Sequence, residues 1–384
     1  MVSGADAIHP GFGFLSENAR FAELCEKCGI TFVGPPSKVI RMLGNKKIAR
    51  STMIAAGVPV VPGSEGDVED IETGLKEAER IGYPVIIKAA LGGGGKGMRV
   101  ANTPEEFPEA YATARKESEI AFGDGTMYIE HFVVNPRHIE FQILADSQGN
   151  VIHLGERDCS IQRNHQKMIE ESPSAAVSPK LREKMGHAAV TAAKAAGYVN
   201  AGTIEFLLEP DGKFWFMEMN TRIQVEHPVT EWVTGIDLVK EQLKIASGMP
   251  LEIAQEDVRI QGHAIECRIN AENPQKNFRP SPGTIQGAHF PGGNGIRVDT
   301  CVYNGCKIPP YYDSMLAKLI VHAGNRKEAI AKMQSALGEV IIDGIDTNID
   351  YQYEILKDED YQSGNFDTGF LASHIIAGVK INEN

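Results

Sequence analysis

The sequence has few cysteines and no long apolar run, and each absence excludes a class of protein. Six cysteines in 384 residues, without the spacing of a disulfide framework, favour a reducing compartment. No stretch approaches the length of a membrane-spanning run, and the opening MVSGADAIHPG lacks the basic and apolar regions of a secretory signal. The sequence therefore predicts a cytoplasmic protein that is neither exported nor bound to a membrane.

Positive charge is also scarce, because 38 Lys and Arg stand against 51 Asp and Glu, for a formal net charge of −13. Nucleic-acid binding depends on clustered cations, so this balance argues against a nucleic-acid partner. An acidic substrate would need a local basic pocket instead. With 42% apolar residues the chain can bury a large core, and its length favours two or three domains.

Strand and helix patterns are mixed along the chain, which predicts an α+β or α/β fold. The opening ADAIHPGFGFLSENARFAELCEKCGITFVGPP is typical of a short strand, a glycine-rich turn, a helix and a second short strand. Such a fragment cannot cover its own parallel strands, so we expect that the first members of a sheet are missing. Strands lengthen after Tyr128, and residues 313–384 have an α/β pattern.

The segment LGGGGKG lies between two predicted strands. Gly92, Gly94 and Gly97 match GxGxxG, but a strand follows where a dinucleotide fold needs a helix, and no Ser or Thr follows Lys96 as in a P-loop. The bare N–H groups can still cover a phosphate. Lys88, near the end of the apolar run PVIIK, would then have an anionic partner; a lysine that extends to water is the alternative.

A hairpin is predicted at Asp211-Gly212. If these two residues form the whole turn, Glu205 lies directly opposite Glu218, where like charges are destabilising. Apolar neighbours predict partial burial, so a divalent cation is the simplest remedy. Two carboxylates and the carbonyl of Asn220 suit magnesium. A solvated acid pair is the alternative, and a three-residue Pro-Asp-Gly loop would shift the register by one.

The segment EMNTRIQVEH continues that strand. In an extended chain, alternate side chains share a face. One face would then carry Glu218, Asn220, Arg222, Gln224 and Glu226. The segment need not remain a regular strand beyond Asn220.

Five segments together resemble the biotin carboxylase family of the ATP-grasp superfamily: HPGFGFLSENA, YPVIIKA with GGGGKGMR, ERDCSIQRNHQKMIEESP, EMNTRIQVEHPVTE and GHAIECRINAE. The similarity covers essentially the whole chain and implies an ATP-grasp fold with a glycine-rich lid. The implied domains are a remnant of an N-terminal Rossmann-like α/β domain (1–45), a linker helix and ATP-grasp lid (46–133), an ATP-grasp body (134–248) and a C-terminal biotin carboxylase domain (249–384).

The resemblance also implies the reaction, which is ATP-dependent carboxylation of biotin by bicarbonate through carboxyphosphate. The implied cofactors are ATP, Mg²⁺ or Mn²⁺, and biotin as a carrier-bound substrate. The implied partners are a biotin carboxyl carrier protein and a carboxyltransferase component, as in acetyl-CoA carboxylase, and a second copy of the chain when it is full length.

Site residues follow from the same motifs. ATP would contact Lys46, Lys88, Gly94, Gly95, Glu130, His131, Phe132, Val133, His138, His165, Glu205 and Glu218. The metal ligands would be Glu205, Glu218 and Asn220, and bicarbonate would be held by Lys167, Arg222, Gln224 and Val225. Glu226 would be the base, and Arg268 would stabilise the biotin enolate. Phe12, near the biotin site, stands where the family usually has Tyr.

Two alternatives remain open from the sequence. Another ATP-grasp ligase, one that forms carbamoyl phosphate or carboxylates a purine precursor, would share the ATP residues but lack the row of Arg222, Gln224 and Glu226 together with Arg268. A truncated and catalytically impaired ATP-binding fragment would bind ATP without turnover. The family chain normally begins earlier than this sequence, which is the feature that favours the second alternative.

Overall fold

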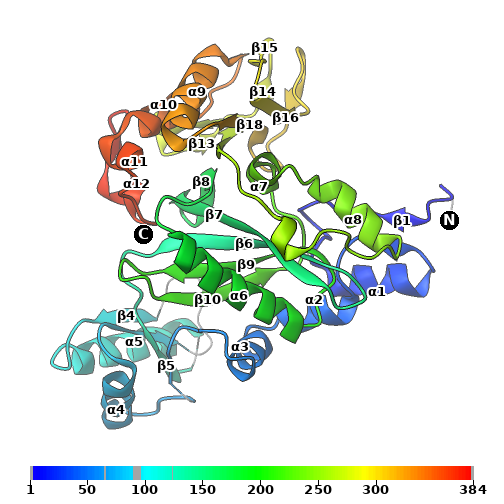
Figure 1. Cartoon of the computed structure of the whole chain (residues 1–384). Coiled ribbons are helices and arrows are strands. Elements are labelled where there is room, and N and C mark those ends of the chain that lie inside the picture. The colour runs from blue at the N-terminus through cyan, green and yellow to red at the C-terminus, as the bar shows by residue number, and fades with distance from the viewer. Residues whose placement is uncertain (1–2, 65, 90–96, 123, 382–384) are drawn as a thin grey trace. The chain divides into compact units, whose positions relative to one another are not determined.

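The computed structural model describes residues 3–381 except 65, 90–96 and 123 (Figure 1). The chain forms two compact units. One contains Met1–Val58 and Arg137–Asn384, and the other contains Pro59–Pro136. The smaller unit is therefore an insertion in the sequence of the larger one. Among the described residues, no helix combines the length and the apolar character needed to cross a membrane.

An eight-stranded sheet lies at the centre of the larger unit, in the order β10-β9-β6-β7-β8-β11-β18-β16. Its neighbouring strands pair antiparallel. The strands are β6 (Arg137–Ala145), β7 (Val151–Arg163), β8 (Gln166–Ser172), β9 (Asn200–Leu208), β10 (Phe214–Asn220), β11 (His263–Asn270), β16 (Ile296–Thr300) and β18 (Met315–Ala323). The pairing of β8 with β11 joins the part of the sheet formed before residue 250 to the part formed after it.

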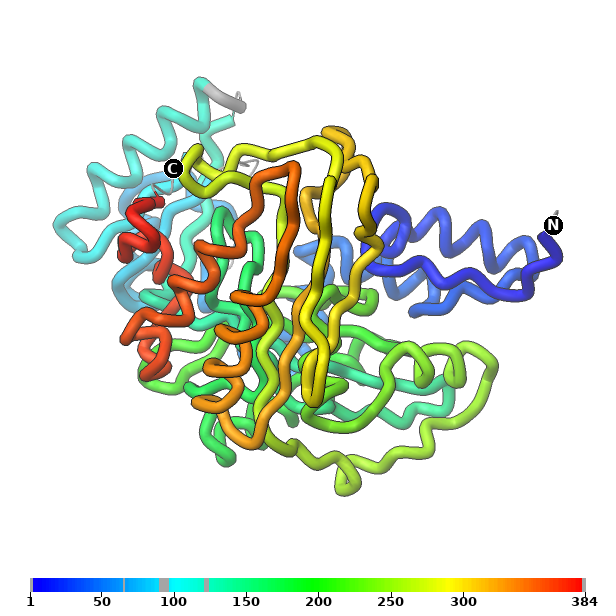
Figure 2. The backbone as a smooth tube through the Cα atoms, turned by 90° about the horizontal axis from the view of Figure 1, so that it is seen from above, coloured from blue at the N-terminus to red at the C-terminus, as the bar shows by residue number. Residues whose placement is uncertain are grey.

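Helices pack on both faces of this sheet, because successive side chains of each strand point to opposite faces. On β11, Ile265, Cys267 and Ile269 belong to a core under α9 (Arg326–Glu339) and α10 (Ile349–Lys357). Figure 2 shows these helices in orange beside the yellow strands. On the other face, Ala264 packs with α7 (His227–Thr234). Elsewhere in this unit, α6 (Pro179–Ala195) packs on β6 and β7, and α8 (Leu238–Ala246) packs on β9.

The first segment of the larger unit pairs β1 (Ala7–Ile8) with β2 (Thr31–Phe32) in parallel. Its helices are α1 (Ala19–Lys27), α2 (Ser37–Leu43) and α3 (Lys46–Ala55). Asn18 and Asn45 cap α1 and α3, because each side-chain oxygen accepts from two backbone N–H groups that the helix leaves unpaired. The cap at Asn45 fixes Lys46 as the first residue of α3.

All six cysteines of the chain are free.

Short elements complete the C-terminal part of the larger unit. The short strands and helices are η1 (Gln255–Asp257), β12 (Glu272–Asn273), η2 (Pro274–Lys276), β13 (Arg279–Pro280), β14 (Gly283–Thr284), β15 (Gly287–His289), β17 (Lys307–Ile308), β19 (Ile341–Asp343), α11 (Glu359–Ser363), α12 (Phe370–Ser373), β20 (Ile375–Ile376) and β21 (Val379–Lys380).

The smaller unit is a three-stranded sheet in the order β4-β3-β5 with two helices. Its elements are α4 (Ile71–Ile81), β3 (Val85–Ala89), β4 (Met98–Ala101), α5 (Phe107–Phe122) and β5 (Met127–His131). The core includes Val85, Ile87 and Ile129 from the strands and Phe107 and Tyr111 from α5. The two strands that the sequence predicts on either side of the glycine-rich segment are confirmed by β3 and β4, while residues 90–96 of that segment lie outside the described residues.

Candidate active site

The hairpin of β9 and β10 brings Glu205 opposite Glu218, as predicted, but through the three-residue loop that was the alternative to a two-residue turn. The N–H of Glu209 donates to the carbonyl of Lys213 at 2.8 Å, which encloses a three-residue loop. Beyond this loop Phe216 pairs with Phe206, and the register then shifts before Glu218. A bulge adds one residue to a strand, so it restores the pairing that the longer loop had displaced.

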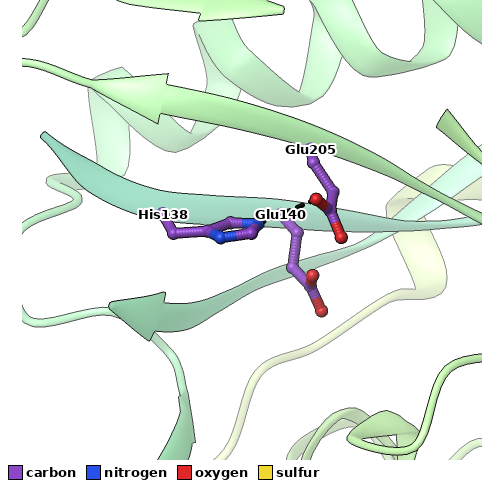
Figure 3. Close-up of side chains that lie close together, drawn as sticks. All are labelled: His138, Glu140 and Glu205. Atoms are coloured by element: carbon purple, nitrogen blue, oxygen red, sulfur yellow. Dashed lines mark ion pairs between the residues drawn. The ribbon is translucent and has the colours of Figure 1, made fainter. Parts of the chain in front are cut away.

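Glu205 lies at the centre of a set of polar contacts. Its Oε1 accepts hydrogen bonds from Lys167 at 2.9 Å, Asn220 at 2.8 Å and Gln224 at 2.8 Å. Its Oε2 is 3.0 Å from Nε2 of His138 on β6, the contact drawn dashed in Figure 3. Burial would raise the pKa of Glu205, but Lys167 and His138 lower it well below its usual range.

Lys167 joins three buried carboxylates. Its ammonium lies 2.5 Å from Oε2 of Glu140, 2.7 Å from Oε1 of Glu226 and 2.9 Å from Oε1 of Glu205. Burial alone would lower the pKa of Lys167, but Glu140 and Glu226 raise it well above its usual range. The lysine is therefore charged, and it is the common counter-ion of β6, β9 and the segment after β10.

Arg157 on β7, which is not among the predicted site residues, supports this arrangement. It is fully buried and donates to Oε1 of Glu140 at 2.5 Å and to Oε1 of Gln224 at 2.9 Å. It also donates to Gln142, Thr203 and Thr230. Since Gln224 in turn donates to Glu205, Arg157 fixes the orientation of that amide. The sequence signal that could have identified Arg157 is a charged residue in the middle of a long predicted strand.

Glu226 occupies the N-cap position of α7 and is held between two cations. Its Oε1 accepts from Lys167, and its Oε2 accepts from Nη2 of Arg268 at 2.9 Å. Burial would raise the pKa of Glu226, but Lys167 and Arg268 lower it well below its usual range. Nε of Arg268 donates to Glu170 on β8 at 2.6 Å, so one guanidinium bridges two buried carboxylates.

The predicted polar face of EMNTRIQVEH is partly wrong. The strand β10 ends at Asn220, and Thr221 and Ile223 are as buried as Gln224 and Glu226, so regular alternation stops there. Nη2 of Arg222 donates to Oδ1 of Asn220 at 3.0 Å. The row therefore stays together through side-chain contacts rather than through a continuous strand.

Other predicted residues lie at the edges of this cluster. Lys46 acts electrostatically on Glu218. The carbonyl of Val225 accepts from Lys318 at 2.8 Å, and the ammonium of Lys318 lies 5.9 Å from the centroid of the Phe12 ring. His165 is exposed in the turn between β7 and β8, with a φ of 61°, and is not part of the contact network.

The remaining predicted ATP residues belong to the smaller unit. Lys88 on β3 forms an ion pair with Glu130 on β5. His131 ends β5, and Phe132 and Val133 follow it. The N–H of Phe132 donates to the carbonyl of Pro84 at 2.8 Å, which fixes the chain after the strand. Gly94 and Gly95 lie outside the described residues.

Glu205, Glu218 and Asn220 have the donor types that a magnesium or manganese ion takes. They offer two carboxylates and an amide carbonyl, the hard oxygen donors that such ions take. Glu218 is exposed, and desolvation and the Glu205 carboxylate raise its pKa. A divalent cation would remove that repulsion. His138, Glu140 and Glu205 also bring ligand atoms within 4.8 Å of one another. Both oxygens of Glu140 are bound by Arg157 and Lys167, and both oxygens of Glu205 also have partners. The distinguishing feature of the first set is therefore the charge of Glu218, which forms no ion pair among the described residues.

The antiparallel sheet, the inserted three-stranded unit and the lysine-linked carboxylates define an ATP-grasp enzyme. Three family models match the chain: "Carbamoyl-phosphate synthase L chain, ATP binding domain" at residues 45–254, "Biotin carboxylase C-terminal domain" at 266–373 and "Biotin carboxylase, N-terminal domain" at 1–40. The chain belongs to the biotin carboxylase family, and its activity is ATP-dependent carboxylation of biotin.

Individual relatives are similar over nearly the whole chain. Biotin carboxylase 1 of Bacillus subtilis strain 168 is 57% identical over 98% of this chain and 84% of its own length. The crystal structure of the biotin carboxylase subunit of pyruvate carboxylase has a TM-score of 0.90 at 53% identity, over 97% of this chain and 83% of that one. The biotin carboxylase domain dimer of Hydrogenobacter thermophilus 2-oxoglutarate carboxylase, in complex with MgADP, ADP and bicarbonate, has a TM-score of 0.85 at 52% identity, over 97% and 82%.

Proposed function

We propose that the cluster around Lys167 performs the first half-reaction of a biotin-dependent carboxylase such as acetyl-CoA carboxylase, in which bicarbonate carboxylates biotin on a carrier protein. The observation that supports this proposal is that Glu226 is held ionised between Lys167 and Arg268. Bicarbonate needs to lose a proton to become a useful nucleophile. Glu226 is ionised and oriented to accept that proton. The cations that lower its pKa also weaken it as a base, but the same cations would stabilise the dianion that bicarbonate becomes when it loses the proton.

Bicarbonate would bind to Lys167, Arg222, Gln224 and the backbone at Val225. The two cations and the amide would fix its oxygens, and Glu226 would accept its proton. Protonation of Glu226 would weaken its hydrogen bond to Arg268, since a neutral carboxyl attracts a guanidinium less strongly. The same proton transfer would thus activate one substrate and release Arg268 for the other.

ATP would be bound by Lys46, Lys88, Gly94, Gly95, His138, His165 and the segment from Glu130 to Val133. Glu205, Glu218 and Asn220 would hold Mg²⁺ or Mn²⁺, which neutralises phosphate charge when bound. The terminal P–O bond of ATP breaks to leave ADP, and a new P–O bond forms to the bicarbonate oxygen, giving carboxyphosphate. Lys167 would stabilise the charge that develops during this transfer.

Biotin would lie against Phe12 and Arg268. Carboxyphosphate releases carbon dioxide and phosphate, and the phosphate takes the ureido proton of biotin. Arg268 would stabilise the resulting enolate, which attacks carbon dioxide through the ureido nitrogen. The partners that fit this chemistry are a biotin carboxyl carrier protein, a carboxyltransferase component and a second copy of the chain. Similar chains belong to carboxylases of pyruvate and 2-oxoglutarate, so the final acceptor differs among relatives.

The test is ATP hydrolysis measured with and without bicarbonate and with and without free biotin. We expect bicarbonate-dependent hydrolysis that biotin stimulates, and a loss of roughly 10²- to 10⁴-fold in Glu226→Gln. Glu183→Gln, on the exposed face of α6, is the matched control and should behave as wild type. No stimulation by biotin in a folded, ATP-binding protein would exclude the proposed reaction and favour another ATP-grasp ligase.

A further inference from the structure

A second pair of glutamates lies beside Arg268, and its two members face each other across neighbouring strands. Glu170 on β8 and Glu266 on β11 are direct cross-strand partners, and both side chains are fully buried. Oε1 of Glu170 is bound to Nε of Arg268 at 2.6 Å. Its Oε2, and both carboxylate oxygens of Glu266, meet no hydrogen-bond donor in the described part of the chain. Three acceptor atoms are therefore buried without a partner, where each costs free energy.

The surroundings of Glu266 explain why ionisation is disfavoured there. Its neighbours on the same sheet face, Ala264 and Ile320, pack against Val229 and Val233 of α7 in an apolar cluster. The nearest cation on β18, Lys318, donates to the carbonyl of Val225 and pairs with Asp299. The other charged groups that act on Glu266 are Glu170, Arg268 and Glu226. Those that act on Glu170 also include Lys167.

Two carboxylates that oppose each other in a dry site cannot both ionise at low cost. Burial raises the pKa of Glu170 to about 7 and that of Glu266 well above its usual range. A single proton resolves the conflict. If Glu266 carries this proton, its O–H can donate a hydrogen bond to Oε2 of Glu170. Side chains directly opposite in a sheet have Cβ atoms roughly 5 Å apart, so the two carboxyl groups are within reach of each other.

We propose that Glu266 is a positioning residue for biotin carboxylation. Its carboxyl group stays protonated and donates a hydrogen bond to Glu170, which keeps Glu170 as the anion that orients Arg268. The inference rests on the proposed function, because Arg268 is the group assigned to the biotin enolate. Arg268 then meets one full negative charge from this pair and one from Glu226. Loss of the shared proton would add a third charge around the guanidinium and weaken its action on the enolate.

The first test compares Glu266→Gln and Glu266→Leu in ATP hydrolysis with bicarbonate, with and without biotin. Gln retains an N–H donor and cannot ionise, so we expect wild-type stimulation by biotin at neutral pH and no decline at alkaline pH. Leu removes the donor, so we expect stimulation by biotin to fall roughly tenfold while biotin-independent hydrolysis is kept. A Gln variant with the wild-type alkaline decline, or a Leu variant with wild-type stimulation, would overturn the inference.

The second test does not use activity. The infrared spectrum of the folded wild type should contain the carbonyl stretch of a protonated carboxylic acid at neutral pH, and Glu266→Gln should lack it, with Glu183→Gln as control. Absence of this band in the wild type, or its persistence in Glu266→Gln, would overturn the shared proton while leaving the proposed function intact. Failure of biotin to stimulate the wild type would instead overturn the proposed function, whatever the infrared spectrum contains.

Discussion

Two pairs of opposed glutamates lie in the same eight-stranded sheet and differ in their electrostatics. Glu205 and Glu218 face each other between β9 and β10, and Glu170 and Glu266 face each other between β8 and β11. In the first pair the pKa of Glu205 is lowered. In the second pair both pKa values are raised, that of Glu170 to about 7.

The difference comes from the groups around each pair. Glu205 contacts Lys167 and His138 and accepts from two amides, and its partner Glu218 is open to solvent. Glu170 has one cation, and Glu266 has no contact with any cation in the described residues. The first pair can therefore take a metal ion, and the second takes a proton. The strand register alone does not determine whether a glutamate pair takes a metal ion or a proton.

Removal of Lys167 should have the largest effect, because it would make the first pair resemble the second. In Lys167→Met, Glu140, Glu205 and Glu226 lose their common cation, so the pKa of Glu226 should rise and the base should become protonated. We expect bicarbonate-dependent ATP hydrolysis to fall roughly 10²-fold or more. The free energy of unfolding should fall by about 3–5 kcal/mol, measured by urea titration.

Lys180→Met, at an exposed position of α6, is the control for this change. It should leave both the turnover and the urea midpoint unchanged. Near-normal hydrolysis in Lys167→Met would contradict the assignment of this lysine as the shared counter-ion.

Glu218→Gln should affect the metal requirement next. The change removes one negative ligand from the pair that fits a divalent cation, but it leaves Glu205 and Asn220 in place. We expect the Mg²⁺ concentration for half-maximal hydrolysis to rise roughly tenfold or more, with activity recovered at high Mg²⁺. Glu266→Gln should not alter this requirement. An equal shift in both variants would mean that the two pairs do not differ as described.

The pH dependence of stability should separate the two pairs by a smaller amount. A carboxyl whose folded pKa is raised contributes stability that is complete below its ordinary value of 4.5 and is lost as pH rises towards the folded pKa. Glu266→Gln cannot ionise, so this variant does not lose stability at position 266 as the pH rises. We therefore expect the variant to gain about 1–3 kcal/mol over wild type between pH 5 and pH 7, measured by urea unfolding. A difference that is constant with pH would contradict a raised pKa at Glu266.

The sequence predicted the first pair because its signals are local. Alternation along GTIEFLLEP and FWFMEMN identifies two strands, and Asp211-Gly212 identifies the turn between them. The loop has the three residues of the alternative rather than two, yet Glu205 still faces Glu218 because a bulge compensates for the extra residue. That Lys167 and Glu226 act at one site followed only from the family motif, since 59 positions separate them, and their direct contact was not predicted.

The second pair could not be predicted because nothing local marks it. Glu170 and Glu266 become neighbours only when β8 pairs with β11, and Arg268 lies 98 positions from the glutamate that it binds. Glu266 in HAIECRIN has the pattern of an ordinary strand residue, and its lack of a donor appears only when α7 covers it. Arg157 was missed for a similar reason, because its five acceptors come from β6, β9 and the region from Gln224 to α7.

The smallest effect is expected at Phe12. Its ring is 38% exposed and lies 5.9 Å from the ammonium of Lys318. Phe12→Tyr keeps the ring and adds a hydroxyl, so the KM for biotin should change less than about threefold. Phe12→Ala removes a cation–π contact of about 0.5–1 kcal/mol and should raise that KM more. If Tyr and Ala had equal effects, the ring would not be the contacting group, and Lys318 would serve only Val225 and Asp299.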